Sequence, residues 1–259
     1  MAMIITMTNM ITTTITMAGK IFRRAATFLT VLLVGIQVFA VDYEAHPLEY
    51  FKEKRKNDYS FAMSSAKDIY GYLKKQEYPY ALEAVSIVFP EMMRYSAFQN
   101  EIESLINEIL SFTSDESSRF SIGLFQMKPL FASAVEKLVR ADPELRKKYP
   151  TIDHNGIAFD TSSRRDRIMR LRKLDFQIEY LKAFIDYEVK TLGLQNEKQD
   201  DRIKYLSAAY NYGIQTSREK LETVFDWKSF PSGKRNLYFN YQKICLAAAE
   251  EIFLQGTTE

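Results

Sequence analysis

Three short segments of this chain combine residue types that could act together on a polar ligand. In Phe89-Pro90-Glu91, a carboxyl group follows an apolar run. The segment Ser121-Ile122-Gly123-Leu124-Phe125-Gln126-Met127-Lys128-Pro129 places a serine, a glycine and an amide beside bulky apolar side chains. The third segment is Ala208-Ala209-Tyr210-Asn211-Tyr212-Gly213. A carboxyl group among apolar side chains can keep its proton near neutral pH, and an amide can orient a ligand because it both donates and accepts hydrogen bonds.

Each of these polar residues also has an ordinary structural explanation. Glu91 could be a solvated carboxylate at a helix end, and Glu83 and Glu101 are competing carboxyl groups. The two amides could cap helix ends, which asparagine does commonly. A tyrosine on an apolar helix face, such as Tyr210, is more often a core residue than a functional one.

The composition indicates a helical protein with a substantial core. The 259 residues are 46% hydrophobic and 26% charged, and only 9 glycines and 7 prolines are available for turns. The formal net charge of +2 does not indicate a nucleic-acid partner, which would require a concentrated basic stripe. With the single cysteine Cys245 and two histidines, we expect neither an intrachain disulfide nor a metal site, and no cofactor.

Apolar residues at helical spacing predict an all-α fold around the three segments. Pro90 is expected to end or kink its helix at Phe89, because a proline ring clashes with the preceding turn. Residues 41–60 are polar and charged, and we interpret them as a solvated lead-in. The predicted helices are Phe61–Lys75, one opening at Pro79, Ile102–Ile109, one with Pro129 in its first turn, Ile168–Val189 as the longest, one through Ile203 and Tyr210 that ends at Gly213, and Tyr241–Phe253.

Residues 1–40 are typical of a leader with a secretory signal, whose start could be Met17 instead of Met1. Basic residues precede the apolar run Phe28–Val38, and Ala40 suits cleavage by a signal peptidase. An uncleaved membrane anchor is the alternative, but the apolar segment of about 16 residues is shorter than the ~20 needed to span a bilayer. We therefore expect export to the periplasm or cell envelope, with membrane contact only if the signal is retained.

The order of the three segments resembles the soluble lytic transglycosylase and goose-type lysozyme group, which cleaves the glycan strands of bacterial peptidoglycan. That family carries a catalytic glutamate near a helix end, then a Gly-Leu-(Met/Phe)-Gln loop closing in a proline, then Ala-Tyr-Asn-x-Gly. The resemblance implies a helical lysozyme-like domain over residues 78–253, preceded by a lead-in and helix at 41–77. Two features depart from the family: Met92 stands where serine is usual, and the interval from Glu91 to Gly123 is longer.

The resemblance also implies roles for individual residues. Glu91 would be the single general acid and base, and Tyr210 could orient it through its hydroxyl. No second acid accompanies the motifs, which favours capture of the sugar by its own 6-hydroxyl and a 1,6-anhydro product; a hydrolytic route would need an acid such as Asp153 or Asp160. The implied substrate-binding residues are Ser121, Gly123, Leu124, Phe125, Gln126, Met127, Tyr210, Asn211 and a tyrosine of the last segment, Tyr238 or Tyr241.

Two classes of function follow from these observations. The first is an enzyme that cleaves peptidoglycan glycan strands, as a transglycosylase or as a hydrolytic lysozyme. The second is a catalytically weak relative that binds glycan or serves as a scaffold in envelope machinery, with Met92 as its signature.

Overall fold

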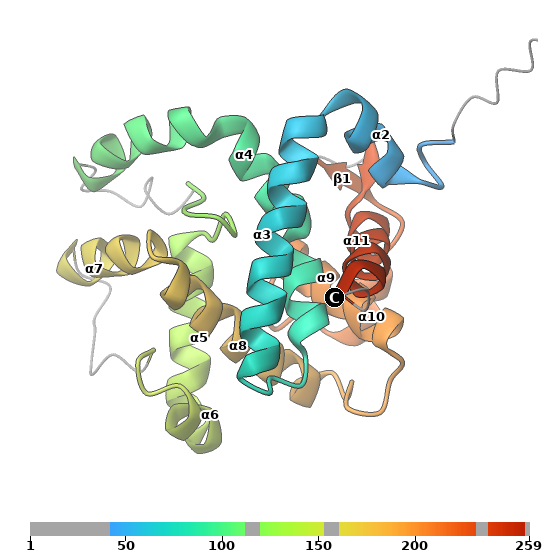
Figure 1. Cartoon of the computed structure of the whole chain (residues 1–259). Helices are drawn as coiled ribbons and strands as arrows, with labels where there is room; N and C mark the ends of the chain where they lie inside the picture. Colours follow the sequence, from blue (N-terminus) through green and yellow to red (C-terminus); the bar gives the residue numbers. More distant parts are fainter. Residues whose placement is uncertain (1–41, 112–119, 153–160, 232–237, 257–259) are drawn as a thin grey trace, which may run out of the picture. The chain divides into compact units, whose positions relative to one another are not determined.

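Helices make up nearly all of the regular structure (Figure 1). The computed structural model describes residues 42–111, 120–152, 161–231 and 238–256, with 98–111, 161–164 and 255–256 described as backbone only. The helices are α2 (Pro47–Lys54), α3 (Lys56–Lys75), α4 (Ala81–Ser111), α5 (Pro129–Ala141), α6 (Pro143–Lys148), α7 (Thr161–Leu171), α8 (Leu174–Thr191), α9 (Gln199–Tyr212), α10 (Arg218–Glu222) and α11 (Tyr241–Gly256). Strands β1 (Lys228–Phe230) and β2 (Phe239–Asn240) form one antiparallel pair. The prediction of an essentially all-α protein is confirmed.

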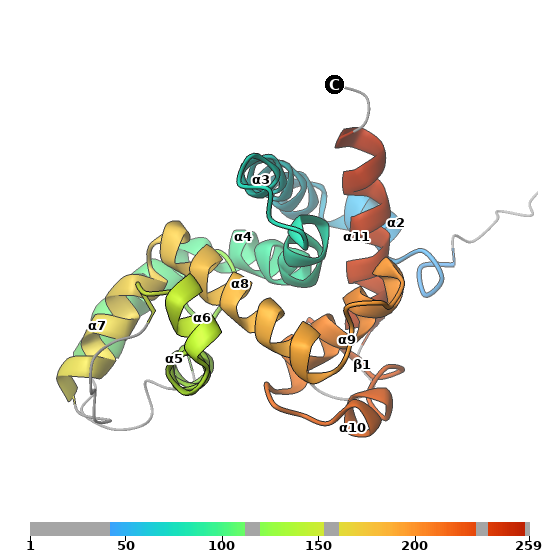
Figure 2. The ribbon, with the colours of Figure 1, turned by 90° about the horizontal axis from the view of Figure 1, so that it is seen from below.

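All of these elements belong to the unit Tyr43–Glu259, and the expected leader lies outside the described residues. Helix α4 has the most extensive contacts with other helices. Helices α3, α9 and α11 contact it, and Figures 1 and 2 show α3 and α11 beside it. Every residue of its first half, from Ala81 to Met93, is buried. No helix in the described part of the chain is long and apolar enough to cross a membrane.

Of the two outcomes predicted for Pro90, the end of the helix at Phe89 is wrong, whereas the ribbon of α4 does change direction along its length (Figure 1). Helix α4 continues through Pro90 and is 31 residues long in total. It includes Ile102–Ile109, which was expected as a separate helix. A proline inside a helix costs roughly 3 kcal/mol or more. Burial of side chains such as Val88 and Phe89 stabilises the helix by about 1.5–3 kcal/mol each, so packing outweighs the local preference. Glu91 therefore lies within a helix, and not at a helix end.

The interpretation of residues 41–60 as a solvated lead-in is also wrong. This stretch contains α2 and the start of α3, and Leu48 and Phe51 are buried. The Phe51 ring centroid lies 5.7 Å from that of Phe230 and 5.1 Å from that of Phe239. Phe51 could not be recognised from the sequence as a core residue, because charged residues flank it and its packing partners are distant in the sequence.

The helix predicted over Ile168–Val189 is divided into α7 and α8, with an extended Lys173 between them, and α4 is the longest helix described. Three other boundaries are confirmed. Helix α5 begins with Pro129, α9 ends before Gly213, and α11 begins at Tyr241.

Candidate functional site

The segment Ile122–Met127 forms a tight hairpin, here called the Gly123 hairpin. The Ile122 N–H donates to the Met127 carbonyl at 2.9 Å, and the Met127 N–H returns a bond of 3.0 Å to Ile122. The turn requires positive φ angles of 71° at Gly123 and 49° at Gln126. Gln126 is stabilised in this conformation because its side-chain amide donates to the Gly123 carbonyl at 2.8 Å. Glycine adopts this conformation without a steric penalty.

Helices α8 and α9 hold the backbone of this hairpin. The Phe125 N–H donates to the side-chain oxygen of Gln177 at 2.8 Å, and the Tyr210 hydroxyl donates to the Phe125 carbonyl at 2.7 Å. Phe125 and Met127 are fully buried and anchor the hairpin in the core. The Tyr210 hydroxyl thus positions the hairpin, and does not orient Glu91 as the resemblance implied.

Glu91 projects from α4 and is only 5% exposed. One turn later on the same helix, the Arg94 guanidinium donates from Nη1 to Glu91 Oε2 at 2.7 Å. A second nitrogen of Arg94 donates to the carbonyl of Pro231, and the guanidinium lies 5.2 Å from the centre of the Phe230 ring. Glu91 is therefore a buried carboxyl group with one cationic partner.

Burial raises the pKa of Glu91 above the ordinary glutamate value, since an apolar environment disfavours the charged form. The positive charges of Arg94 and Lys128 and the nearby Tyr241 hydroxyl oppose this effect without cancelling it. The pKa values of Tyr210 and Tyr241 are well above the usual range because both are buried and face Glu91. At neutral pH both hydroxyls are therefore uncharged.

Glu91 opens into a small pocket of about 90 Å³, here called the Glu91 pocket. Its walls come from α4, the Gly123 hairpin and the residues flanking it, α5 and α9. The lining residues are Glu91, Arg94, Ser121, Gln126, Met127, Lys128, Phe131, Tyr210 and Asn211. The structure thus brings side chains of all three sequence segments to one place.

Other residues of the implied substrate-binding set lie outside the pocket lining. Gly123 lies against α7 and α8, Phe125 is buried beneath the hairpin, and Leu124 is half-buried. Asn211 does line the pocket, and its amide donates to the Ser229 hydroxyl at 3.0 Å.

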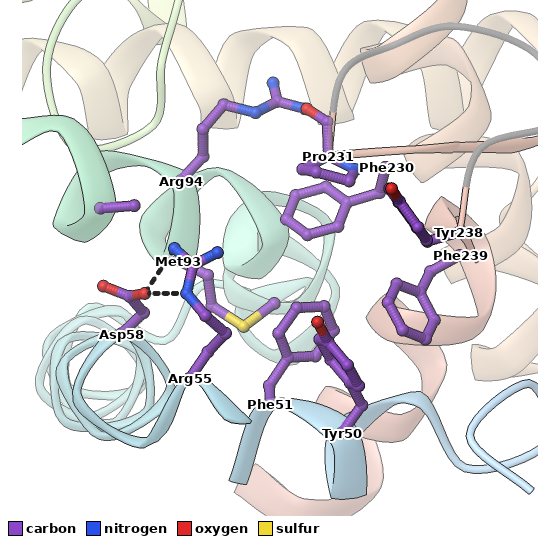
Figure 3. A pocket seen from close by; sticks show the side chains of 11 residues that line it. Tyr50, Phe51, Arg55, Asp58, Met93, Arg94, Phe230, Pro231, Tyr238 and Phe239 are labelled. Carbon is purple, nitrogen blue, oxygen red and sulfur yellow. Dashed lines mark hydrogen bonds and ion pairs between the residues drawn. The ribbon is translucent and has the colours of Figure 1, made fainter. Parts of the chain in front are cut away.

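The structure separates the two tyrosines between which the sequence could not decide. Tyr241 is fully buried beside Glu91, and its hydroxyl donates to the Ile87 carbonyl at 2.9 Å. Tyr238 is 72% exposed and lines a different pocket (Figure 3). Tyr241 is therefore the one of these two tyrosines that lies against Glu91, although neither of them lines the Glu91 pocket.

Comparison of the chain with protein-family models, with curated proteins and with solved structures found no significant match. The likeness to the lytic transglycosylase group consequently depends on the three segments and on the pocket that they share.

The competing carboxyl groups have other surroundings. Glu83 is 1% exposed, forms an ion pair with Arg202 at 2.7 Å and does not line the Glu91 pocket. The side chain of Glu101 lies outside the described residues, as do Asp153 and Asp160. Within the described ranges, no group of three or more His, Cys, Asp or Glu side chains could hold a metal ion.

Four residues that shape this site were not predicted from the sequence: Arg94, Lys128, Phe131 and Gln177. Arg94 would have been found if the helix had been continued through Pro90, because residues three apart share a helix face. Gln177 carries a different signal, since it is a polar residue on the buried side of an amphipathic helix. Such a residue needs a hydrogen-bond partner, and here the partner is the hairpin backbone.

Proposed function

We propose that this chain is an exported peptidoglycan lytic transglycosylase with a lysozyme-like helical domain and Glu91 as its general acid and base. One observation carries the proposal: a buried glutamate with a raised pKa shares a pocket with Ser121, Gln126 and Asn211, which come from the other two segments of the family pattern. A raised pKa keeps a proton available near neutrality, as a glycosidase acid requires.

In this reaction the protonated Glu91 gives its proton to the glycosidic oxygen as the bond from that oxygen to C1 of the muramic sugar breaks. The N-acetyl group of that sugar stabilises the positive charge at C1. The ionised Glu91 then takes the proton from the 6-hydroxyl while the oxygen of that hydroxyl bonds to C1, which closes a 1,6-anhydro ring. Among the residues that line the Glu91 pocket, Glu91 is the one carboxyl group, which supports intramolecular capture over attack by an activated water.

The test is the variant Glu91→Gln, which keeps the size of the side chain but cannot give and reclaim a proton. We expect release of soluble muropeptides from purified sacculi to fall by about 10²–10⁴-fold, the usual contribution of a general acid–base group. Glu250→Gln, an exposed change on α11, is the matched control and should retain full activity. An unchanged rate in Glu91→Gln would contradict the assignment.

A catalytically weak glycan-binding or scaffold relative is the second candidate. The ion pair between Glu91 and Arg94 favours it, because the positive charge stabilises the ionised carboxylate instead of the acid. Co-sedimentation of the wild-type chain with sacculi, with no turbidity loss and no soluble product, would support this role over the enzyme.

A further inference from the structure

Helix α7 and the turn that follows it contain the most basic ten residues of the chain. Residues 164–173 carry five arginines, one lysine and a single acid, a net charge of +5, whereas the whole chain has a formal net charge of +2. The remainder of the chain therefore carries a net charge of −3. Figures 1 and 2 both show α7 at the edge of the described unit. Positive charge concentrated on one peripheral element indicates an anionic partner.

One side of α7 is used to pack against α5 and α8. Ile168 and Leu171 are buried on this side. Arg167 is buried with them, and its guanidinium pairs with Glu136 at 2.6 Å. Arg170 is half-buried, with its guanidinium 5.6 Å from the centre of an aromatic ring of α8. Two of the basic residues of α7 therefore serve the fold itself.

The other side of α7 is exposed and mixes cations with apolar side chains. Arg165, Met169 and Arg172 are spaced by four and three residues, which places them on one face, and all three are exposed. The Arg172 guanidinium donates to the Met169 sulfur at 3.8 Å, so these two side chains lie against each other. Lys173 and Leu174 continue the surface into the start of α8, and both are exposed. We call these five residues the basic face.

The three cations of the basic face have no counter-charge within the fold. Unlike Arg167, none of Arg165, Arg172 and Lys173 forms an ion pair with a carboxylate among the described residues. The apolar members are unusually open for their type, because Met169 is 42% exposed and Leu174 is 39% exposed. Basic and apolar side chains together on an exposed helix face are typical of segments that lie on an anionic membrane.

We infer that the basic face binds the surface of an anionic lipid bilayer. Arg165, Arg172 and Lys173 would contact the lipid phosphates, and Met169 and Leu174 would enter the boundary between headgroups and acyl chains. A soluble polyanion offers the same phosphates but no acyl layer, so the two exposed apolar side chains favour the bilayer. This contact does not require a retained leader. None of the five residues lines the Glu91 pocket, so the inference is independent of the proposed function.

The inference can be tested by sedimentation with lipid vesicles. The tested chain begins at Val41, the first residue after the predicted cleavage site, because an apolar leader would itself bind lipid. We expect its partition coefficient on phosphatidylcholine vesicles that contain about 30% phosphatidylglycerol to exceed that on pure phosphatidylcholine at least tenfold, and to fall steeply as salt is raised. Equal binding to both vesicles, or no binding to the anionic ones, would overturn the inference. This comparison uses the wild-type chain and depends on no variant.

Two charge variants test whether the basic face is the site. Arg165→Gln combined with Arg172→Gln should lower the partition coefficient on the anionic vesicles about 30-fold, since each cation near such a surface contributes about fivefold. Lys56→Gln combined with Lys67→Gln removes the same charge from exposed positions on α3 and should change it less than about twofold. Equal losses in the two double variants would show that overall charge, and not the basic face, is responsible.

Met169→Gln tests the apolar contact, because it leaves the charge unchanged. It should lower the partition coefficient on the anionic vesicles about fivefold and leave binding to long-chain polyphosphate unchanged. If vesicle binding were also unchanged, the side chain would not enter the bilayer, and a soluble polyanion would be the partner in place of the membrane.

Discussion

At the scale of residues, the buried carboxyl groups differ mainly in whether a cation accompanies them. Glu136 accepts N–H bonds from Nε and Nη2 of Arg167 and an O–H bond from Tyr180, and Glu91 accepts from Arg94. Within the described ranges, no cation pairs with Glu188. One of its oxygens accepts from the Gln215 N–H at 2.9 Å, and the other has no hydrogen-bond partner among the described residues. Burial therefore raises the pKa of Glu188 to about 7.

This pKa predicts how stability depends on pH. The folded chain keeps the Glu188 proton up to about pH 7, whereas the unfolded chain loses it near 4.5, so wild-type stability should fall as pH rises across that window. The difference corresponds to roughly 3 kcal/mol. Glu188→Gln cannot ionise at this position. The free energy of unfolding of the variant minus that of the wild type, measured in urea, should therefore increase by up to that amount between pH 5 and pH 8. If the free energies of unfolding of the two chains changed in parallel with pH, the raised pKa of Glu188 would be contradicted. Glu250→Gln serves as the exposed control.

At the scale of elements, the Gly123 hairpin depends on a backbone contact that the sequence does not reveal. A Cβ atom at Gly123 would lie 2.0 Å from Gln177 Nε2 and 2.5 Å from the Leu171 carbonyl oxygen. Gly193 has nearly the same positive φ, 68° against 71°, but has nothing within 4 Å of the Cβ position. Alanine substitutions at the two glycines therefore distinguish the cost of backbone strain from the cost of a steric clash.

We expect Gly193→Ala to destabilise the fold by about 1–2 kcal/mol, the cost of the left-handed conformation alone. Gly123→Ala should cost about 1–3 kcal/mol more, because the added carbon also displaces Gln177 from the Phe125 N–H. Urea unfolding of the two variants measures the difference. Equal losses would show that the hairpin does not lie against α7 and α8 as described.

The elements also show what the sequence could and could not predict. The turn at Gly123, the start of α5 at Pro129 and the end of α9 at Gly213 are determined by local backbone preferences, and each was predicted. The course of α4 through Pro90 was not, because the burial that stabilises it comes from helices far away in the sequence. Ending the helix at Phe89 also meant that Arg94 was not predicted as a site residue, because Arg94 lies beside Glu91 only if the helix is continuous.

At the scale of the whole described unit, the N-terminal helices are part of the core that supports the site. Helix α3 packs along α4, and its residues Ala66 and Leu73 are fully buried. The Tyr59 hydroxyl donates to Glu251 on α11 at 2.5 Å, and this contact joins segments 192 positions apart. Contacts of this kind have no local signal, which explains why the lysozyme-like domain implied over residues 78–253 gave no role to the helices before it.

Cooperative folding of the unit should therefore depend on helices α2 and α3. A chain that begins at Tyr43 should unfold cooperatively, whereas one that begins at Tyr78 should lose cooperative unfolding in circular dichroism, because it lacks Leu48, Phe51 and Leu73. Each such buried side chain contributes about 1.5–3 kcal/mol, and a whole domain retains only about 5–15 kcal/mol of stability. Equal melting temperatures for the two chains would show that α2 and α3 are not part of the core.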